Sequence, residues 1–267
     1  MLYPTRLPSF HRLPPPGRLA DRVRWFWIPE WNLPPGRVSR QELLPFPALN
    51  LVVQADGVTL SGPATRRSFR DLSGSGWAVG LLLRPAAVPS FTGDPGALRD
   101  AEIPFPAPEL LAAVQEAMVS GPEPGDSKDD DAGARRRARA VASAGAWLES
   151  RLPSPTGEAL LANRLEEMIQ SNPGLTRVDQ LASGLGVSTR TLQRLARRYV
   201  GLSPLAMIRR YRLQEAAERL RTEPGVTIAD VAAELGYADH AHLASVFQDV
   251  LGFTPSGYRR SSAGETA

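Results

Sequence analysis

Arginine, glutamine and threonine side chains recur at helical spacing between residues 189 and 197. They are Thr189, Arg190, Gln193, Arg194 and Arg197. If Leu192, Leu195 and Tyr199 form the buried face of this helix, the five polar side chains lie together on the opposite face. An arginine can donate two hydrogen bonds to O6 and N7 of guanine, and a glutamine can pair similarly with adenine. We therefore expect a helix that contacts base edges, above all through Arg190, Gln193 and Arg194.

The residues before this helix predict a shorter helix and a tight turn. Thr176 and Asp179 are expected to cap the shorter helix, and Ser188 to cap the longer one. Ala182 allows close packing of the two helices, and Gly186 permits the left-handed backbone that the turn requires. Residues 176–199 are therefore predicted to form a helix-turn-helix.

The same pattern recurs at an offset of 50 or 51 residues. The segment 176–204 reads TRVDQLASGLGVSTRTLQRLARRYVGLSP, and 227–255 reads TIADVAAELGYADHAHLASVFQDVLGFTP. Thr227 with Asp230, Gly236 and Asp239 take the capping and turn positions. The second reading helix would carry Asp239, His240, Ala241, Ala244, Ser245 and Gln248. Residues 204–221 read as one helix with proline in its first turn, so two helix-turn-helix units are expected on a long connecting helix.

Arginine supplies nearly all of the positive charge, and it is unevenly distributed. The chain has 31 Lys+Arg against 28 Asp+Glu, and Lys128 is its only lysine. Seven arginines and no acid lie between 180 and 214, whereas seven acids and two arginines lie between 215 and 258. Because phosphate neutralisation dominates nucleic-acid affinity, we expect the first unit to bind more strongly. The arginines expected at phosphates or in solvent are Arg197, Arg198, Arg209 and Arg210.

Short strand-like runs precede residue 110. They cover Val23 to Ile28, Leu49 to Gln54, Val58 to Leu60 and Trp77 to Leu83, with a hairpin turn at Ala55-Asp56-Gly57. We expect an α+β chain of two domains: a β-rich barrel or sandwich at 1–110, a helical and flexible connector at 111–157, and an all-α domain at 158–262. Within the connector, Gly121 to Arg139 is expected to be exposed, with Arg135, Arg136, Arg137 and Arg139 at a solvated helix start.

The helical half resembles the DNA-binding domain of the AraC/XylS transcription regulators. The resemblance rests on Ala182 and Gly186, Leu192-Gln193-Arg194, Gly201 to Pro204, Arg212-Leu213, Ala216, Leu220, Ala232 to Gly236, Phe247 and Pro255 to Arg259. It implies a bacterial regulator that binds double-stranded DNA in two successive major grooves, works with RNA polymerase and carries an effector-binding or dimerisation domain. Residues 44–85 look similar to the β-rich region of some members. Members more often carry a basic residue near Ser245 and Gln248, so weak base contact is expected there.

The β-rich half offers candidates for an effector pocket. Trp25 and Trp27 could line it, and Arg84 could anchor an anion; the alternative is that the aromatic residues fill a small core and Arg84 is paired at the surface. Arg212 is expected to be a structural ion-pair partner. We predict that Arg194→Ala weakens specific DNA binding by about 1–3 kcal/mol and Ser245→Ala by much less.

Other classes of protein are disfavoured by missing residues. Zero cysteines exclude disulfides and thiol chemistry, and three histidines leave no multi-histidine metal centre, so neither metal nor cofactor is expected. No nucleophile elbow or phosphate loop indicates an enzyme. No long apolar stretch or signal peptide is present, so we expect a cytoplasmic protein without membrane contact. The alternative kept is a small-molecule-binding or enzymatic β domain whose helices serve dimerisation.

Overall fold

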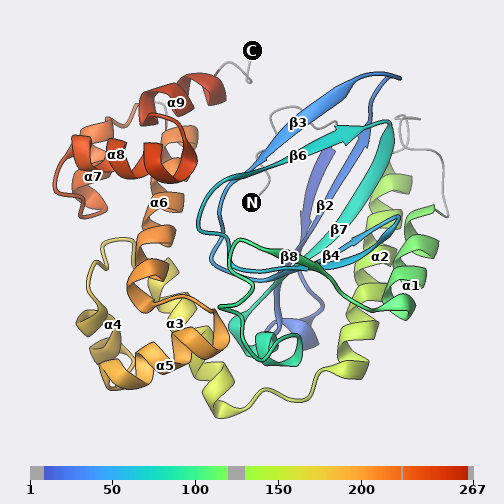
Figure 1. The fold of residues 1–267 in the computed structure, drawn as a ribbon, viewed down its shortest axis with the longest axis horizontal. Coiled ribbons are helices and arrows are strands. Elements are labelled where there is room, and N and C mark those ends of the chain that lie inside the picture. The colour runs from blue at the N-terminus through green and yellow to red at the C-terminus, as the bar shows by residue number, and fades with distance from the viewer. Residues whose placement is uncertain (1–8, 120–129, 224, 264–267) are drawn as a thin grey trace.

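The computed structural model describes residues 9–119, 130–223 and 225–263. A β-rich N-terminal half precedes an all-helical C-terminal half, as expected (Figure 1). The main sheet is antiparallel, in the order β1 (Ser9–Leu13), β2 (Val23–Asn32), β7 (Ser75–Leu83), β4 (Asn50–Gln54), β5 (Gly57–Ser61) and β8 (Glu102–Pro104). A separate antiparallel pair is formed by β3 (Val38–Leu43) and β6 (Ser68–Ser73). Short 3-10 helices lie at Gly17–Leu19 and Pro85–Ser90.

The four strands predicted from sequence are the central ones, β2, β4, β5 and β7. Their apolar runs are buried in the sheet, and the predicted hairpin turn is confirmed because Gln54 pairs with Gly57. Strands β1, β3, β6 and β8 were not predicted. Each is largely polar or short and lies at a sheet edge or in the two-stranded pair, where no continuous apolar run is needed.

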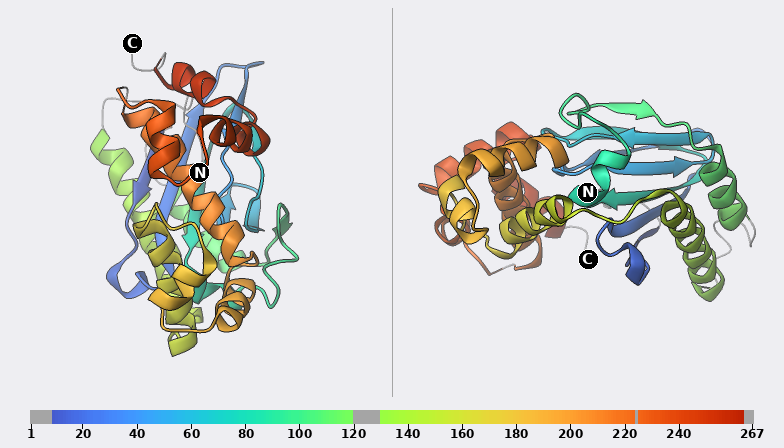
Figure 2. Two further views of the ribbon diagram at one scale, coloured as in Figure 1. Left: turned by 90° about the vertical axis from the view of Figure 1, so that its left-hand side faces the viewer. Right: turned by 90° about the horizontal axis from the view of Figure 1, so that it is seen from below.

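The two faces of the main sheet have different partners. Along β2, Phe26 and Ile28 are fully buried in a core completed by helices α1 (Pro108–Val119) and α2 (Asp130–Arg151). Trp25 and Trp27, which alternate with them, point to the opposite face, toward β3 and β6. Figures 1 and 2 show α1 and α2 on the side of the sheet away from the C-terminal helices.

The helix start expected to be solvated is partly buried. Arg136 and Arg137 are 7% and 8% exposed, and both pair with Glu30 of β2, Arg137 at 3.1 Å. The sequence prediction for these two arginines was wrong, because the acid that pairs with them is more than a hundred residues away in the chain. The rest of the expected exposed stretch, up to residue 129, lies outside the described residues. The domain boundaries remain predictions, although α1 and α2 clearly add to the β-rich core.

The C-terminal half consists of helices arranged around α6 (Pro204–Thr222). Helices α3 (Gly157–Ser171), α4 (Val178–Gly184) and α5 (Thr189–Tyr199) pack at its N-terminal end, and α7 (Ile228–Glu234), α8 (His240–Leu251) and α9 (Pro255–Ala263) at its C-terminal end. The expected pair of helix-turn-helix units on one connecting helix is confirmed. Helices α5 and α8 therefore lie at opposite ends of α6 (Figure 1).

The first helix-turn-helix unit shares a core with the β-rich half. Phe46, Ala48, Leu82 and Ala86 belong to the same buried cluster as the apolar side chains of α3, α4 and α5. The second unit has a cluster of its own, formed with the C-terminal half of α6. The two units are thus anchored to the β-rich half in different ways.

Candidate nucleic-acid interface

The first turn of α4 differs from the sequence prediction. Arg177, not Thr176, occupies the N-cap position, and Gln180 Oε1 accepts a hydrogen bond from its backbone N–H at 3.1 Å. Asp179 instead pairs with the Arg177 side chain, and this contact lowers the pKa of Asp179 to about 2. The turn after α4 is as predicted, with Gly186 at φ 65° in the left-handed region.

Helix α5 has the two faces predicted from its spacing. Leu192 and Leu195 are fully buried and Tyr199 is 2% exposed. Ser188 caps the helix by accepting a hydrogen bond from the Thr191 N–H at 3.1 Å. The predicted outward residues are all exposed: Thr189, Arg190, Gln193, Arg194, Arg197 and Arg198. The structure thus presents them to solvent together, while their contact with DNA remains a prediction.

An acid that sequence reasoning missed adjoins this face. Glu158, in the first turn of α3, pairs with Arg194 through Oε1 and with Arg198 through Oε2 at 2.9 Å. The Tyr199 hydroxyl also donates to its Oε2 at 3.4 Å. Arg190 and Arg197 form no hydrogen bond or ion pair with any described residue. The arginines of α5 therefore fall into a pair held by Glu158 and a pair without a protein partner.

The second unit has the predicted caps but no cation on its exposed helix face. The Thr227 hydroxyl accepts from the Asp230 N–H at 3.0 Å, and the Asp239 carboxylate accepts from the His242 N–H at 2.7 Å. Of the residues predicted to read DNA from α8, His240, Ala241, Ser245 and Gln248 are exposed and Ala244 is half-buried; His242 and Asp249 of the same helix are exposed as well. His242 packs edge-on against the Tyr237 ring, as a packing role requires. Helix α8 thus presents no arginine or lysine to phosphates, and its one exposed acid, Asp249, would repel them.

Arg212 joins the connecting helix to the second turn, but not through an ion pair as predicted. Its Nε donates to the Leu235 carbonyl at 2.6 Å, and its guanidinium lies 4.4 Å from the centre of the Tyr237 ring. Burial lowers the pKa of Arg212. The role is structural, yet its partners are a carbonyl and an aromatic face.

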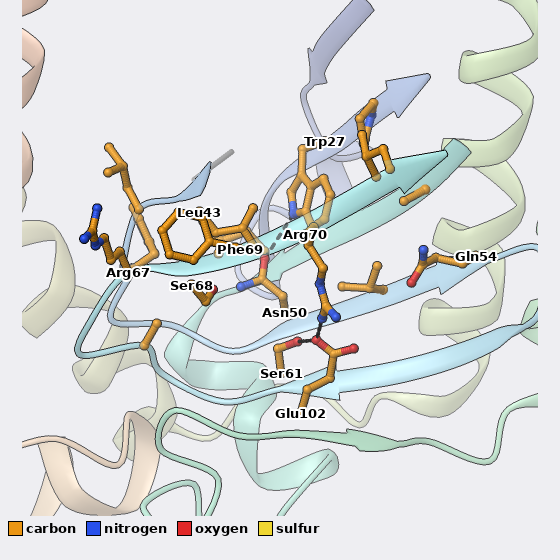
Figure 3. Close-up of a pocket in the computed structure, with 18 of the residues that line it drawn as sticks. Trp27, Leu43, Asn50, Gln54, Ser61, Arg67, Ser68, Phe69, Arg70 and Glu102 are labelled. Atoms are coloured by element: carbon orange, nitrogen blue, oxygen red, sulfur yellow. Dashed lines mark hydrogen bonds and ion pairs between the residues drawn. The ribbon is translucent and has the colours of Figure 1, made fainter. Parts of the chain in front are cut away.

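A cavity of about 630 Å³ lies between the main sheet and the β3–β6 pair. Trp25 and Trp27 line it, and Trp27 Nε1 donates to Asn50 Oδ1 at 3.0 Å (Figure 3), while the binding of an effector there stays a prediction. Arg84 does not line it. Arg84 instead donates to the Ala20 carbonyl at 3.0 Å and pairs with Glu167 of α3, so its predicted role as an anion anchor was wrong and the surface-pair alternative holds.

One cavity residue also contacts the second helix-turn-helix unit. Arg67, beside β6, pairs with Glu42 at 3.2 Å, and its backbone N–H donates to the Val250 carbonyl at 3.3 Å. Its guanidinium lies 5.3 Å from the ring centres of both Phe69 and Phe253. Arg70 of β6 and Ser61 of β5 both bond Glu102 of β8, so the Arg70 contact joins the β3–β6 pair to the main sheet (Figure 3). Arg67 therefore connects the cavity rim to the end of α8.

A buried polar cluster joins the β-rich half to the first unit. Glu166 of α3, 1% exposed, pairs with Arg24 of β2 at 3.0 Å and accepts from the Tyr211 hydroxyl of α6 at 2.8 Å. Burial, and then the Glu166 charge, raise the pKa of Tyr211 well above its usual value. No group of three or more potential metal-ligating acids or histidines occurs among the described residues. In the same residues, no helix is both long and apolar enough to cross a bilayer.

In comparisons with known proteins, each half of the chain matches a different family model. Residues 181–261 match the family model described as a helix-turn-helix domain, and residues 11–104 match a domain of unknown function, DUF6597. A Streptomyces lividans protein described as an AraC-like transcription regulator is 37% identical over 83 residues, which are 31% of this chain and 27% of that protein. The "Probable transcription factor PqrA" of Proteus vulgaris is 31% identical over 97 residues, 36% of this chain and 78% of its own length.

The first curated relatives are matched over only about a quarter of their length, from 27% to 28%. Among solved structures, ToxT from Vibrio cholerae O395 is 13% identical and aligns with 90% of this chain and 98% of its own, at a TM-score of 0.47. The family model for the helix-turn-helix domain covers the helical half, where the exposed arginines of α5 lie.

Proposed function

The chain belongs to the AraC/XylS family of transcription regulators, and from this membership we propose that it binds specific sites in double-stranded DNA and regulates transcription. The observation that carries the proposal is the exposed face of α5. Arginine and glutamine side chains project from a capped helix whose opposite face is fixed in a core. A rigid helix of this kind suits direct contact with base edges in the major groove.

The two units are proposed to contribute unequally. Helix α5 carries four exposed arginines, whereas α8 carries none and exposes the acid Asp249 in its last turn. Arg190 and Arg197, which lack a protein partner in the described structure, are free to bind phosphates or guanines. The second unit then adds shape complementarity and water-mediated or weak base contacts through Ser245 and Gln248.

Selection from a random-sequence duplex library tests the proposal, followed by footprinting of the selected site. The full chain is expected to enrich one motif made of two half-sites, whose centres lie about 10 base pairs apart. Both half-sites should be protected on the same face of the duplex. A folded chain that enriches no motif at low salt would contradict sequence-specific binding. The variant Arg190→Ala/Gln193→Ala should lose the motif, and Arg37→Ala, in the exposed turn between β2 and β3, should retain it.

We also propose that the cavity holds a small effector. Trp25, Trp27 and Trp31 line its sheet side, so a ligand with an apolar or aromatic body fits best. Tryptophan fluorescence and thermal shifts across a metabolite library would test this. A ligand that binds the chain but not a Trp27→Arg variant supports the site, whereas a ligand indifferent to that change binds elsewhere.

The remaining features of the proposal follow the family. A regulator of this kind acts beside RNA polymerase in the bacterial cytoplasm, and the β-rich half could pair two copies into a homodimer. Its relatives are transcription regulators, and we propose no enzymatic activity for the chain. Sedimentation of the purified chain with and without its selected site would determine the oligomeric state, and chromatin immunoprecipitation would locate it on the genome.

A further inference from the structure

Glu158 is the one acid that touches the exposed face of α5 in the described structure. It lies in the first turn of α3, whose N-terminus is capped by Thr156 accepting from the Ala159 N–H at 3.2 Å. Its carboxylate is therefore held by a fixed helix end, where negative charge is favoured. The side chain is 29% exposed, so the pairs it makes are partly shielded from water.

Glu158 divides its two oxygens between two arginines one helical turn apart. Oε1 accepts from Nη1 of Arg194, and Oε2 accepts from Nη1 of Arg198, while the Tyr199 hydroxyl shares Oε2. Each guanidinium has five N–H donors, so four remain on each arginine for other partners. The side chains are 57% and 54% exposed and thus still accessible to a duplex.

We propose that Glu158 is a positioning residue that raises the ratio of specific to non-specific DNA affinity. This inference rests on the proposed function, that α5 contacts DNA. Holding Arg194 in one orientation reduces the side-chain entropy lost when its remaining donors bond a guanine. The same carboxylate opposes attraction to phosphates of any sequence, because it neutralises part of the positive charge of α5.

Both effects of Glu158 act in a specific complex, but only the unfavourable one acts in a non-specific complex. In a specific complex, the gain from a preset arginine offsets the unfavourable charge of Glu158. In a non-specific complex no base geometry is satisfied, so only the unfavourable charge remains. Removing the carboxylate therefore strengthens non-specific binding without an equal gain at the specific site.

The test compares Glu158→Gln with the unaltered chain. Dissociation constants are measured for the duplex selected by the unaltered chain and for a random duplex of equal length, at several salt concentrations. We expect random-duplex affinity to rise roughly three- to tenfold, as for the loss of two partly exposed ion-pair contacts. The salt dependence of log K should steepen by about 1, and affinity for the selected duplex should change less than twofold.

Glu167→Gln is the matched control. Glu167 lies on the same helix, nine residues or about two and a half turns from Glu158 and thus on the opposite face, and it pairs with Arg84 rather than with α5. The control removes the same charge from the same helix, so it should leave both affinities nearly unaltered. Melting temperatures of both variants establish that folding is retained.

A second variant separates positioning from general repulsion. On an Arg194→Gln/Arg198→Gln background, Glu158→Gln should lose most of its effect on random-duplex affinity, since the side chains it holds are gone. The inference would be overturned if Glu158→Gln raised the affinity for both duplexes equally or for neither. It would also be overturned if Glu167→Gln raised the random-duplex affinity as much as Glu158→Gln does. If the unaltered chain selects no motif, the proposed function fails and this inference fails with it.

Discussion

The buried contact between Arg24 and Glu166 gives a sharp prediction about how the two halves are held together. Arg24→Met keeps most of the side-chain volume but removes the cation that faces a carboxylate 1% exposed to solvent. Glu166 is left with one hydrogen bond in the structure, from the Tyr211 hydroxyl. Stranding a buried charge in this way costs about 3–5 kcal/mol.

The two contacts of Glu166 join three elements, so the loss is expected to loosen the interface between β2, α3 and α6. Chemical denaturation should show a midpoint lowered for the helical half, and limited proteolysis should cut sooner near 152–156, between α2 and α3. Arg24→Met/Glu166→Gln should recover most of the loss, because a neutral amide can still accept from Tyr211. The reasoning would be refuted if Arg24→Met lowered the free energy of unfolding by less than 1 kcal/mol, or if Arg24→Met/Glu166→Gln were less stable than Arg24→Met.

Three further predictions concern the reading helices and the cavity. Arg194→Ala should weaken binding to the selected duplex by about 1–3 kcal/mol in gel-shift titrations, and Ser245→Ala by much less; equal losses would contradict the asymmetry of the two units. Arg67→Ala should loosen the end of α8, so its amide hydrogens should exchange faster while those of α5 do not change. Gly80→Ala would place a methyl in direct overlap with the Trp27 ring, so the free energy of unfolding should fall by about 1–3 kcal/mol and tryptophan emission should shift; unaltered emission would contradict a Trp27 ring packed over Gly80.

Local features of the helical half were predictable from sequence because their causes lie within a few residues. The Thr227 cap with Asp230 three positions later, and glycines at positive φ in both turns, are set by neighbouring backbone atoms. The central strands were predictable for a similar reason, since β4 and β7 are buried on both faces and keep continuous apolar runs, while β2 and β5 place apolar side chains on the core face. The predicted N-cap at Thr176 was wrong because Arg177, with Gln180 three positions later, starts the helix one residue further along.

The pairings that define the interface were not predictable, because they join residues far apart in the chain. Glu158 reaches Arg194 across 36 positions, and Glu30 reaches Arg136 across 106. The spacing of residues in a single sequence does not indicate such a partner. Any of the 28 acids could pair with a given arginine until the fold brings one of them close. The role expected for Arg84 failed for this reason: its partner Glu167 belongs to the other half.

The central claim is that α5 is the main DNA-reading helix, and one measurement tests it most directly. Footprints and affinities on the selected duplex are compared for Arg190→Ala/Arg197→Ala in α5 and Ser245→Ala/Gln248→Ala in α8. The account predicts that the α5 variant loses protection at its half-site and at least tenfold in affinity, while the α8 variant loses less than threefold. Equal losses, or a larger loss from α8, would contradict it.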